Sequence, residues 1–286
     1  MTELRAIETE PGLVFDVLID GPADGPLVLL LHGFAESFHM WRAQLPALAA
    51  AGYRAVAPSQ RGYSAGARPN TAELANYQFD RLLADALAIV AACGRGRRRF
   101  HLVGHDWGAG IAWGLADRHA DRVASLTVVS RPHPNAFNRA LFMPDGEQAR
   151  RSRHHKAFLE PDAAAKVLTD GARWLRERWA KCGVSATAVE DYLSVLGNAP
   201  AMEAALAWYR ARGAIRAPLG IIAEPVLYIW GEEDDTVGRV AAEGTRDFVS
   251  GPYRFETLPG VGHFAVDQAG KRVTELLLAH LASHPA

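Results

Sequence analysis

The residue with the clearest chemical potential is Asp106, at the centre of Gly104-His105-Asp106-Trp107-Gly108. The apolar run Phe100–Val103 precedes this pattern, and the helix-forming run Ala109–Leu115 follows it. Glycines on both sides of a central residue let a strand and a helix come close together around a sharp turn. A carboxylate raised on such a turn, with helix amides behind it, is placed to attack carbon. The alternative is that Asp106 only caps the helix.

A carboxylate nucleophile needs a base for water and an acid that orients this base if its ester is to be hydrolysed. His263 ends the loop Gly260-Val261-Gly262-His263, and Asp234 follows the apolar run that ends at Gly231. The chain order Asp106, Asp234, His263 is a known order of nucleophile, acid and base. Asp235 is the alternative acid.

Backbone amides are expected to stabilise the oxyanion that forms when water attacks such an ester. The turn geometry assigns one donor to the N–H of Trp107, directly after the nucleophile. The other donor is the N–H of Phe34, in the loop after the apolar run Leu27–Leu31. This chemistry requires no metal and no organic cofactor, and the sequence signals none.

The segment Gly62-Tyr63-Ser64-Ala65-Gly66 matches the Gly-x-Ser-x-Gly pattern of serine esterases. That pattern is functional only between a strand and a helix. Here Pro58–Arg61 separates it from its strand, and Arg68-Pro69-Asn70 prevents a helix from beginning directly after it. We therefore interpret the match at Ser64 as a coincidence in a loop.

Strands and helices are predicted to alternate through most of the chain, as in a largely parallel α/β sheet. Continuously apolar runs such as Leu27–Leu31 are typical of strands that are covered on both faces. Strands are predicted at 13–19, 27–31, 53–57, 100–103, 123–129, 225–231 and 253–258, and helices at 38–51, 82–93, 109–115, 240–249 and 271–281.

From about Asn138 to Gly213 the chain shows amphipathic helical stretches and no strand. We expect a helical cap at residues 132–216, inserted between two parts of the core at 1–131 and 217–286. Aromatic residues of this insertion either line a pocket or fill the interior of the cap; they are Trp174, Trp179, Tyr192, Trp208 and Tyr209.

With 286 residues, 49% hydrophobic and 22% charged, the chain can bury a large core. A net charge of -1 provides no general basic surface for nucleic acid or an anionic membrane. The basic cluster Arg95–Arg99 is interpreted as a solvated turn. Two distant cysteines, Cys93 and Cys182, indicate a reducing compartment. Residues 1–8 lack a signal-peptide core, and no run is long enough to span a bilayer, so a cytoplasmic protein is expected.

Taken together, these motifs resemble the epoxide hydrolase and haloalkane dehalogenase branch of the α/β hydrolases. The resemblance spans nearly the whole chain, and its specific part is the aspartate nucleophile. It implies an α/β-hydrolase fold, with a mostly parallel sheet flanked by helices and an inserted helical cap. The segments that carry it are His32-Gly33-Phe34-Ala35-Glu36-Ser37, Arg61-Gly62-Tyr63, Gly104–Gly108, Gly231-Glu232-Glu233-Asp234 and Gly262-His263.

The leaving group separates the two members of this branch. Opening an epoxide expels an alkoxide that must be hydrogen-bonded or protonated, whereas halide needs only weak donors. The resemblance implies two donors in the cap, usually tyrosines, and Tyr209 in Trp208-Tyr209-Arg210 matches the second. A tyrosine is still protonated at pH 7 and can donate. In place of the first tyrosine stands His154, with His155 as the alternative, and an imidazole N–H also donates.

A cap histidine beside a tyrosine also resembles the halide pocket of fluoroacetate dehalogenases, but these carry arginine where this chain has Trp107. Ordinary haloalkane dehalogenases commonly carry asparagine where it has Phe34. We therefore predict an epoxide hydrolase that converts an apolar or aromatic epoxide into a vicinal diol through an ester on Asp106. The alternative is a haloalkane or haloacid dehalogenase. The expected partner is a small molecule, and the protein is expected to be a monomer or homodimer.

Overall fold

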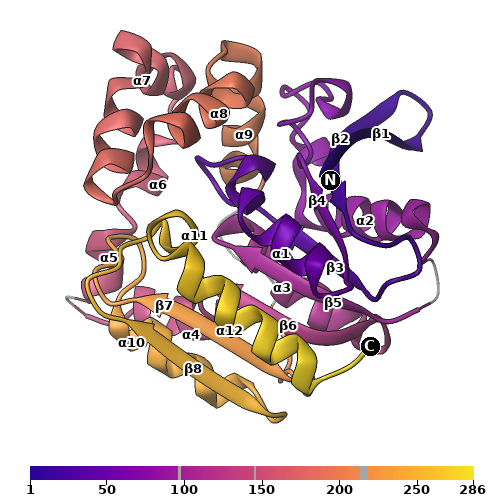
Figure 1. Cartoon of the computed structure of the whole chain (residues 1–286). Coiled ribbons are helices and arrows are strands. Elements are labelled where there is room, and N and C mark those ends of the chain that lie inside the picture. Colours follow the sequence, from indigo (N-terminus) through magenta and orange to yellow (C-terminus); the bar gives the residue numbers. More distant parts are fainter. Residues whose placement is uncertain (96–97, 145, 213–217) are drawn as a thin grey trace.

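The computed structural model describes residues 1–95, 98–144, 146–212 and 218–286, and a single eight-stranded sheet runs through them (Figure 1). Its strand order is β1-β2-β4-β3-β5-β6-β7-β8, antiparallel from β1 to β4 and parallel from there on. The predicted α/β class is confirmed. The strands are β1 (Glu3–Glu10), β2 (Leu13–Asp20), β3 (Leu27–Leu31), β4 (Arg54–Pro58), β5 (Phe100–His105), β6 (Val123–Val129), β7 (Val226–Gly231) and β8 (Tyr253–Leu258).

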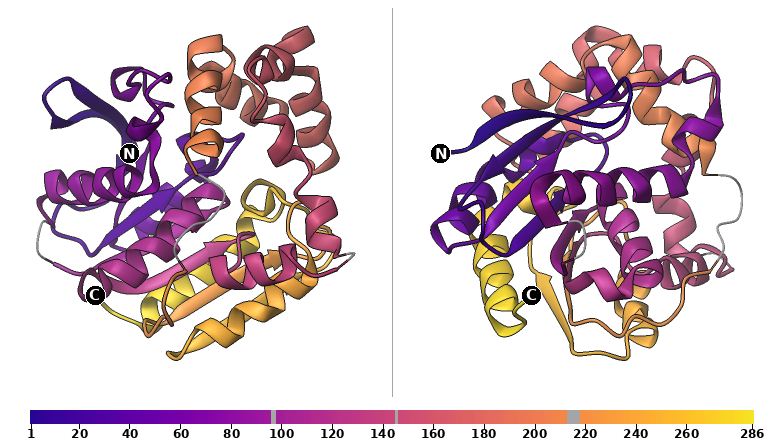
Figure 2. Two further views of the ribbon diagram at one scale, coloured as in Figure 1. Left: turned by 180° about the vertical axis from the view of Figure 1, so that it is seen from behind. Right: turned by 90° about the vertical axis from the view of Figure 1, so that its right-hand side faces the viewer.

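Helices cover both faces of the sheet, with α1 and α12 on one face and α2, α3, α4 and α10 on the other (Figures 1 and 2). Because of this double cover, β3 and β6 are buried at every residue, as their continuously apolar runs predict. The helices of this layer are α1 (Gln44–Ala50), α2 (Phe79–Val90), α3 (Trp107–Arg118), α4 (Pro134–Leu141), α10 (Arg239–Glu243) and α12 (Gly270–Ser283).

The strand β1 has no counterpart in the sequence prediction. It forms an edge of the sheet, pairs only with β2, and most of its residues are exposed. A strand that buries neither face carries no apolar alternation, so its sequence of mixed charges does not predict it.

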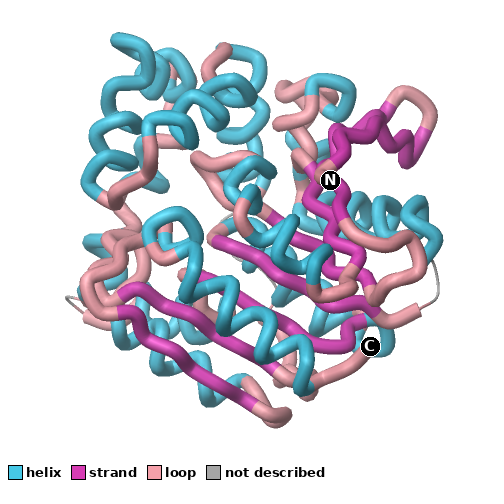
Figure 3. Tube along the Cα trace, in the orientation of Figure 1, coloured by secondary structure: helices cyan, strands magenta, loops and turns pink. Residues whose placement is uncertain are grey.

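A second group of helices lies above the sheet, on the side to which the parallel strands point (Figures 1 and 3). They are α5 (Glu147–Arg151), α6 (His154–Ala157), α7 (Ala163–Lys181), α8 (Ala186–Leu196) and α9 (Ala199–Ala211). Within the predicted cap at 132–216, α4 instead packs against α10 and the short helix Gly244–Phe248 of the core. The extent of the cap remains a prediction, because its last residues lie outside the described ones.

Two further expectations concern the surface and the membrane. The predicted turn at Arg95–Arg99 includes residues 96 and 97, which lie outside the described part of the chain. In the described ranges, no helix combines the length and the apolar character that crossing a membrane requires. Both cysteines are free thiols.

Candidate active site

Asp106 lies on a sharp turn between β5 and α3, with backbone angles of φ 47° and ψ -113°. Its two flanking glycines allow this turn. A Cβ on Gly104 would lie 2.5 Å from the carbonyl carbon of Gly108, and a Cβ on Gly108 would collide with the carbonyl oxygen of Leu31. The side chain of Asp106 makes no capping hydrogen bond to α3. The alternative of a simple helix cap is therefore wrong.

The loop after β3 also contacts the Asp106 carboxylate. The N–H of Phe34 donates to Oδ1 of Asp106 at 3.2 Å. This close approach needs a glycine, because a Cβ on Gly33 would lie 2.5 Å from Cβ of Asp106. The other predicted oxyanion donor, Trp107, is the first residue of α3 and is buried.

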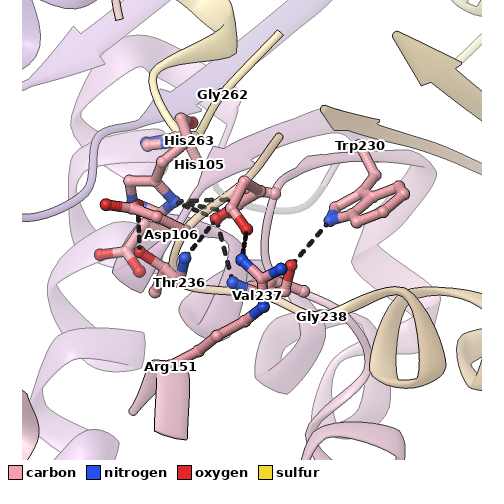
Figure 4. A network of polar contacts seen from close by, with 12 residues as sticks. His105, Asp106, Arg151, Trp230, Thr236, Val237, Gly238, Gly262 and His263 are labelled. Atoms are coloured by element: carbon pink, nitrogen blue, oxygen red, sulfur yellow. Dashed lines mark hydrogen bonds and ion pairs between the residues drawn. The ribbon is translucent and has the colours of Figure 1, made fainter. Parts of the chain in front are cut away.

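His263 and Asp234 come together at the ends of β7 and β8, as predicted from their order in the chain. Nδ1 of His263 lies 3.2 Å from both carboxylate oxygens of Asp234, and both residues are buried. The N–H groups of Thr236 and Val237 donate to Oδ1 of Asp234 at 2.8 and 3.0 Å (Figure 4). The alternative acid, Asp235, points away and pairs with Arg178 at 2.8 Å. The geometry thus selects Asp234.

Both carboxylates are held in the ionised form. Burial alone raises the pKa of Asp106, but the charges of His263 and His105 outweigh it and bring this pKa below its ordinary value. Burial likewise raises the pKa of Asp234, yet His263 and a hydrogen bond from Ser130 hold it far below its usual range. An ionised Asp106 is the form that acts as a nucleophile.

Ser130 is a member of this site that the sequence analysis missed. Its hydroxyl donates to Oδ2 of Asp234 at 2.6 Å and lies 3.0 Å from Nδ1 of His263. Ser130 follows β6 and has a φ of 66°, and its carbonyl accepts a hydrogen bond from the Tyr228 hydroxyl at 2.7 Å. Nothing in the sequence pattern separates this serine from any other residue after a buried strand.

From the helices above the sheet, Tyr209 on α9 reaches the turn at Asp106. Its ring centroid lies 5.0 Å from that of Trp107 and 5.6 Å from that of Phe34. Burial and the charge of Asp106 raise the pKa of Tyr209 above its ordinary value, so its hydroxyl stays protonated. The neighbouring Trp208 fixes α9 to the core by donating from Nε1 to the carbonyl of Arg61 at 3.0 Å.

The two candidate histidines of α6, His154 and His155, differ in their contacts. Nδ1 of His154 lies 3.0 Å from the carbonyl of Arg151, and a carbonyl can only accept. Burial lowers the pKa of His154 to about 4, so at neutral pH the ring is uncharged and its single proton sits on Nδ1. Its Nε2 then carries a lone pair, which does not suit the predicted donor role. The ring of His155 instead packs against Tyr209, with centroids 5.5 Å apart.

The other aromatic residues of the helical insertion are mostly interior. Trp179, Tyr192 and Trp208 are fully or almost fully buried. Trp174 is 41% exposed and lines a cavity of about 270 Å³ with His154 and other cap residues. Of the predicted pocket residues, Tyr209 therefore lies at the Asp106 turn, and Trp174 lies on a cavity at the surface of the helical insertion.

The serine-esterase pattern has no catalytic setting. Ser64 is buried, and its hydroxyl donates to the carbonyl of Ser59 at 2.9 Å and accepts from the N–H of Asp16 at 2.8 Å. The first bond holds the loop after β4 together, and the second fixes this loop to β2. These contacts are structural, and they agree with the prediction that the match to the serine-esterase pattern at Ser64 is a coincidence.

A family model described as "alpha/beta hydrolase fold" matches residues 26–269. The chain belongs to this family. This alpha/beta hydrolase is 32% identical to epoxide hydrolase A of Mycobacterium tuberculosis, over 97% of its own length and 96% of that protein. It is 30% identical to epoxide hydrolase 3 of Xenopus tropicalis, over 94% and 74% of the two chains.

The same similarity holds in three dimensions. One solved structure belongs to a set of novel epoxide hydrolases from metagenomes of hot environments. It superposes on this hydrolase with a TM-score of 0.87 and shares 29% sequence identity with it. The match covers 99% of this hydrolase and 100% of the other chain. An epoxide hydrolase mutant from Bacillus megaterium superposes with a TM-score of 0.86 and 27% identity, over 97% and 100%. By sequence and by structure, this alpha/beta hydrolase is thus similar to epoxide hydrolases.

Proposed function

We propose that this alpha/beta hydrolase opens epoxides to vicinal diols through an ester on Asp106. The observation that carries the proposal is an ionised aspartate at the nucleophile position, with the buried phenol of Tyr209 against the same turn. A serine there would favour esters. A carboxylate facing a proton donor suits a carbon electrophile whose leaving group is an alkoxide.

In the first half-reaction, a carboxylate oxygen of Asp106 attacks an epoxide carbon and the bond from this carbon to the ring oxygen breaks. The hydroxyl of Tyr209 donates to the ring oxygen and neutralises the alkoxide. The second donor of this proposal is His155, since the proton of neutral His154 is bound to the Arg151 carbonyl. The product of this step is a hydroxyalkyl ester of Asp106.

In the second half-reaction, Nε2 of His263 removes a proton from a water molecule that attacks the ester carbonyl of Asp106. Asp234 and Ser130 orient the imidazole through its Nδ1 side. The N–H groups of Phe34 and Trp107 stabilise the oxyanion. When the ester bond breaks, His263 returns this proton to the departing diol oxygen. Asp106 keeps the oxygen of the water, and the second proton of the water returns to the Tyr209 phenolate, so that both residues are restored.

The surroundings of Asp106 favour an apolar or aromatic substituent on the epoxide. Phe158 of the cap packs edge to face on Phe34 and Tyr209, with centroids 5.2 and 4.9 Å apart. An epoxide hydrolase mutant from Bacillus megaterium, similar in structure at a TM-score of 0.85, was crystallised with a naphthyloxy-propane-1,2-diol as its product. An aryl-substituted epoxide is therefore the substrate of choice for the first assays.

The decisive experiment is a single turnover of styrene oxide in heavy-oxygen water, followed by mass analysis of the peptide that contains Asp106. The proposal expects one heavy oxygen in the Asp106 carboxylate and an unlabelled first-turnover diol. Asp106→Ala is expected to abolish turnover, and His263→Gln to trap the ester. A labelled diol with an unlabelled peptide would overturn the ester route.

A second assay tests the alternative function, that of a dehalogenase. Diol formation from styrene oxide and halide release from 1-chlorobutane and chloroacetate are measured with the same enzyme preparation. Halide release without diol would refute the epoxide hydrolase and leave the Asp106 nucleophile in place.

A further inference from the structure

Phe158 follows the last residue of α6 and is one of the aromatic side chains around the proposed reaction site. Its ring packs edge to face on Tyr209 and on Phe34, with centroids 4.9 and 5.2 Å apart. In the proposed reaction, Tyr209 donates to the epoxide oxygen and the N–H of Phe34 donates to the oxyanion. An epoxide held by these two residues therefore has the ring of Phe158 as a neighbour.

Phe158 also borders a cavity of about 270 Å³ between α6 and α7. The side chain is only 4% exposed, so it lies at the inner end of this cavity, whereas Trp174 lies on the outer side. The centroids of these two rings are 6.1 Å apart. Pockets for whole drug-sized ligands measure roughly 300–1,000 Å³, so this cavity suits a single apolar chain. Apart from His154 and Lys166 its lining is apolar, and it includes Ala157, Ala163 and Val167.

A break within α7 gives this cavity its walls. Asp170, Gly171 and Ala172 have φ angles of 52°, 66° and 62°, in the left-handed region that aspartate and alanine rarely adopt. Ala172 is buried, so the surrounding packing holds the break in place. Val167 before the break and Trp174 after it both line the cavity. The shape of the cavity is thus set by the backbone of α7.

We propose that Phe158 determines which epoxides this hydrolase accepts, because its ring ends the space for the apolar substituent and closes it off from the cavity between α6 and α7. This inference rests on the proposed epoxide hydrolysis. Phe158 touches no reacting atom, so its role is in specificity. An ethyl or phenyl substituent ends before the ring, whereas a long alkyl chain has to pass it. Truncation of Phe158 joins the two spaces, and the apolar walls of the cavity then stabilise the chain.

The first test measures binding without chemistry. The carbonyl of a primary amide accepts a hydrogen bond from Tyr209 in place of the epoxide oxygen, so butanamide and octanamide are probes that differ only in chain length. The wild type is expected to bind octanamide no more tightly than butanamide. Phe158→Ala is expected to raise the ratio of the two affinities at least tenfold, since each buried methylene contributes about fourfold. Tighter binding of octanamide by the wild type, or an unchanged ratio in Phe158→Ala, would overturn the role of Phe158.

The second test measures kcat/KM for 1,2-epoxybutane and 1,2-epoxydecane with the same variants. Phe158→Ala is expected to raise the ratio of the long to the short epoxide at least tenfold, and the smaller truncation Phe158→Val to raise it at least threefold. The ratio is independent of the fraction of folded enzyme and of any general loss of activity. Leu159→Ala is the matched control, because Leu159 is adjacent in the chain but 52% exposed, and it is expected to leave the ratio unchanged.

A double variant tests whether the cavity receives the chain. Val167 lines the cavity and is 6% exposed, so Val167→Trp fills the space with a larger side chain. In the Phe158→Ala background this change is expected to return both ratios to their wild-type values. In the wild-type background it is expected to change neither ratio. A double variant that keeps the preference for long chains would show that they leave by another route, against the proposal.

The two proposals fail in different ways. If no variant forms a diol from either epoxide, epoxide hydrolysis is refuted, while the amide titrations still report on Phe158. If both epoxides are turned over and truncation of Phe158 leaves their ratio unchanged, the specificity role alone is refuted.

Discussion

The Glu36 carboxylate lies 2.7 Å from Nδ1 of His105, and neither side chain is exposed to solvent. Both the Coulomb attraction of Glu36 and its close contact with the ring favour the charged form of His105. Burial lowers the pKa of His105, but Glu36 outweighs it and raises this pKa to about 9. His105 is therefore a buried imidazolium at neutral pH, next to Asp106, and its Nε2 lies 2.9 Å from the carbonyl of His263.

This pair predicts how stability depends on pH. The pKa of His105 is higher in the folded protein than the ordinary 6.5, so its contribution is complete below pH 6.5 and is lost as pH rises through about 9. The shift corresponds to roughly 3 kcal/mol at most. Urea unfolding at several pH values between 7.5 and 9.5 is expected to show a falling free energy of unfolding. Glu36→Gln is expected to be less stable and nearly independent of pH there.

A second titratable group, Asp267, limits the pH range in which this test reports on His105. Burial and then the charge of Glu36 raise the pKa of Asp267 to about 7, so its own contribution changes mainly below that pH. If Glu36→Gln keeps the wild-type slope above pH 7.5, the charged His105 is refuted.

Ser130→Ala is expected to slow ester hydrolysis more than ester formation. The hydroxyl holds Asp234 and lies beside Nδ1 of His263, so its loss leaves the base less well oriented. One hydrogen bond to a charged group is worth about 1.5 kcal/mol, or roughly a tenfold change in rate. Rapid-quench mass spectrometry is expected to detect a larger fraction of enzyme as the Asp106 ester.

The control for Ser130 is Ser125→Ala, on β6. The Ser125 hydroxyl contacts Nδ1 of His101 at 2.8 Å, away from the site. This variant is expected to change thermal stability without changing the ester fraction. The role of Ser130 fails if both variants give the same ester fraction.

Tyr209→Phe is expected to slow ester formation by roughly a hundredfold, because the alkoxide loses a donor that the transition state needs. His155→Ala is expected to slow the same step by roughly tenfold, whereas His154→Ala is expected to leave it almost unchanged. The physical reason is the proton of His154, which is bound to the carbonyl of Arg151. Stopped-flow tryptophan fluorescence measures this step, since Trp107 lies against the nucleophile. The opposite order of the two histidine variants would restore His154 as the donor.

Gly108→Ala is expected to destabilise the protein severely, because the added Cβ would collide with the backbone carbonyl of Leu31. A cost of several kcal/mol is typical when a buried backbone must move. Gly270→Ala is the control, since the nearest atom to its Cβ is Nε2 of Gln44 at 3.9 Å. Thermal unfolding of the two variants tests the contrast. A Gly108→Ala protein as stable as the control would contradict the tight turn.

The sharp turn at Asp106 and the strand ends that carry Asp234 and His263 were predictable from the sequence because they depend on local geometry. Asp106 needs a glycine on either side of a sharp turn, and the strands before Asp234 and His263 are short apolar runs between turns. The helical insertion was visible for the same reason, since a change of hydrophobic period is a local property.

The residues that orient and charge the groups of the site could be identified only in the tertiary structure. Ser130 reaches Asp234 across 104 positions, and Glu36 reaches His105 across neighbouring strand ends. No local pattern marks such pairs, because parallel strands bring together residues that are far apart in the chain. The proposed choice of His155 over His154 likewise rests on one contact within the cap, that of His154 Nδ1 with the carbonyl of Arg151.

The sequence by itself predicted which atom attacks, a carboxylate oxygen of Asp106, because the glycine-flanked turn that presents it is a local feature. Only the tertiary structure decided what surrounds that atom. The packing of α9 over the turn places Tyr209 against Trp107. Charge and shape around a reacting group arise from the way separate segments pack, and this packing is set by the whole core rather than by any one motif.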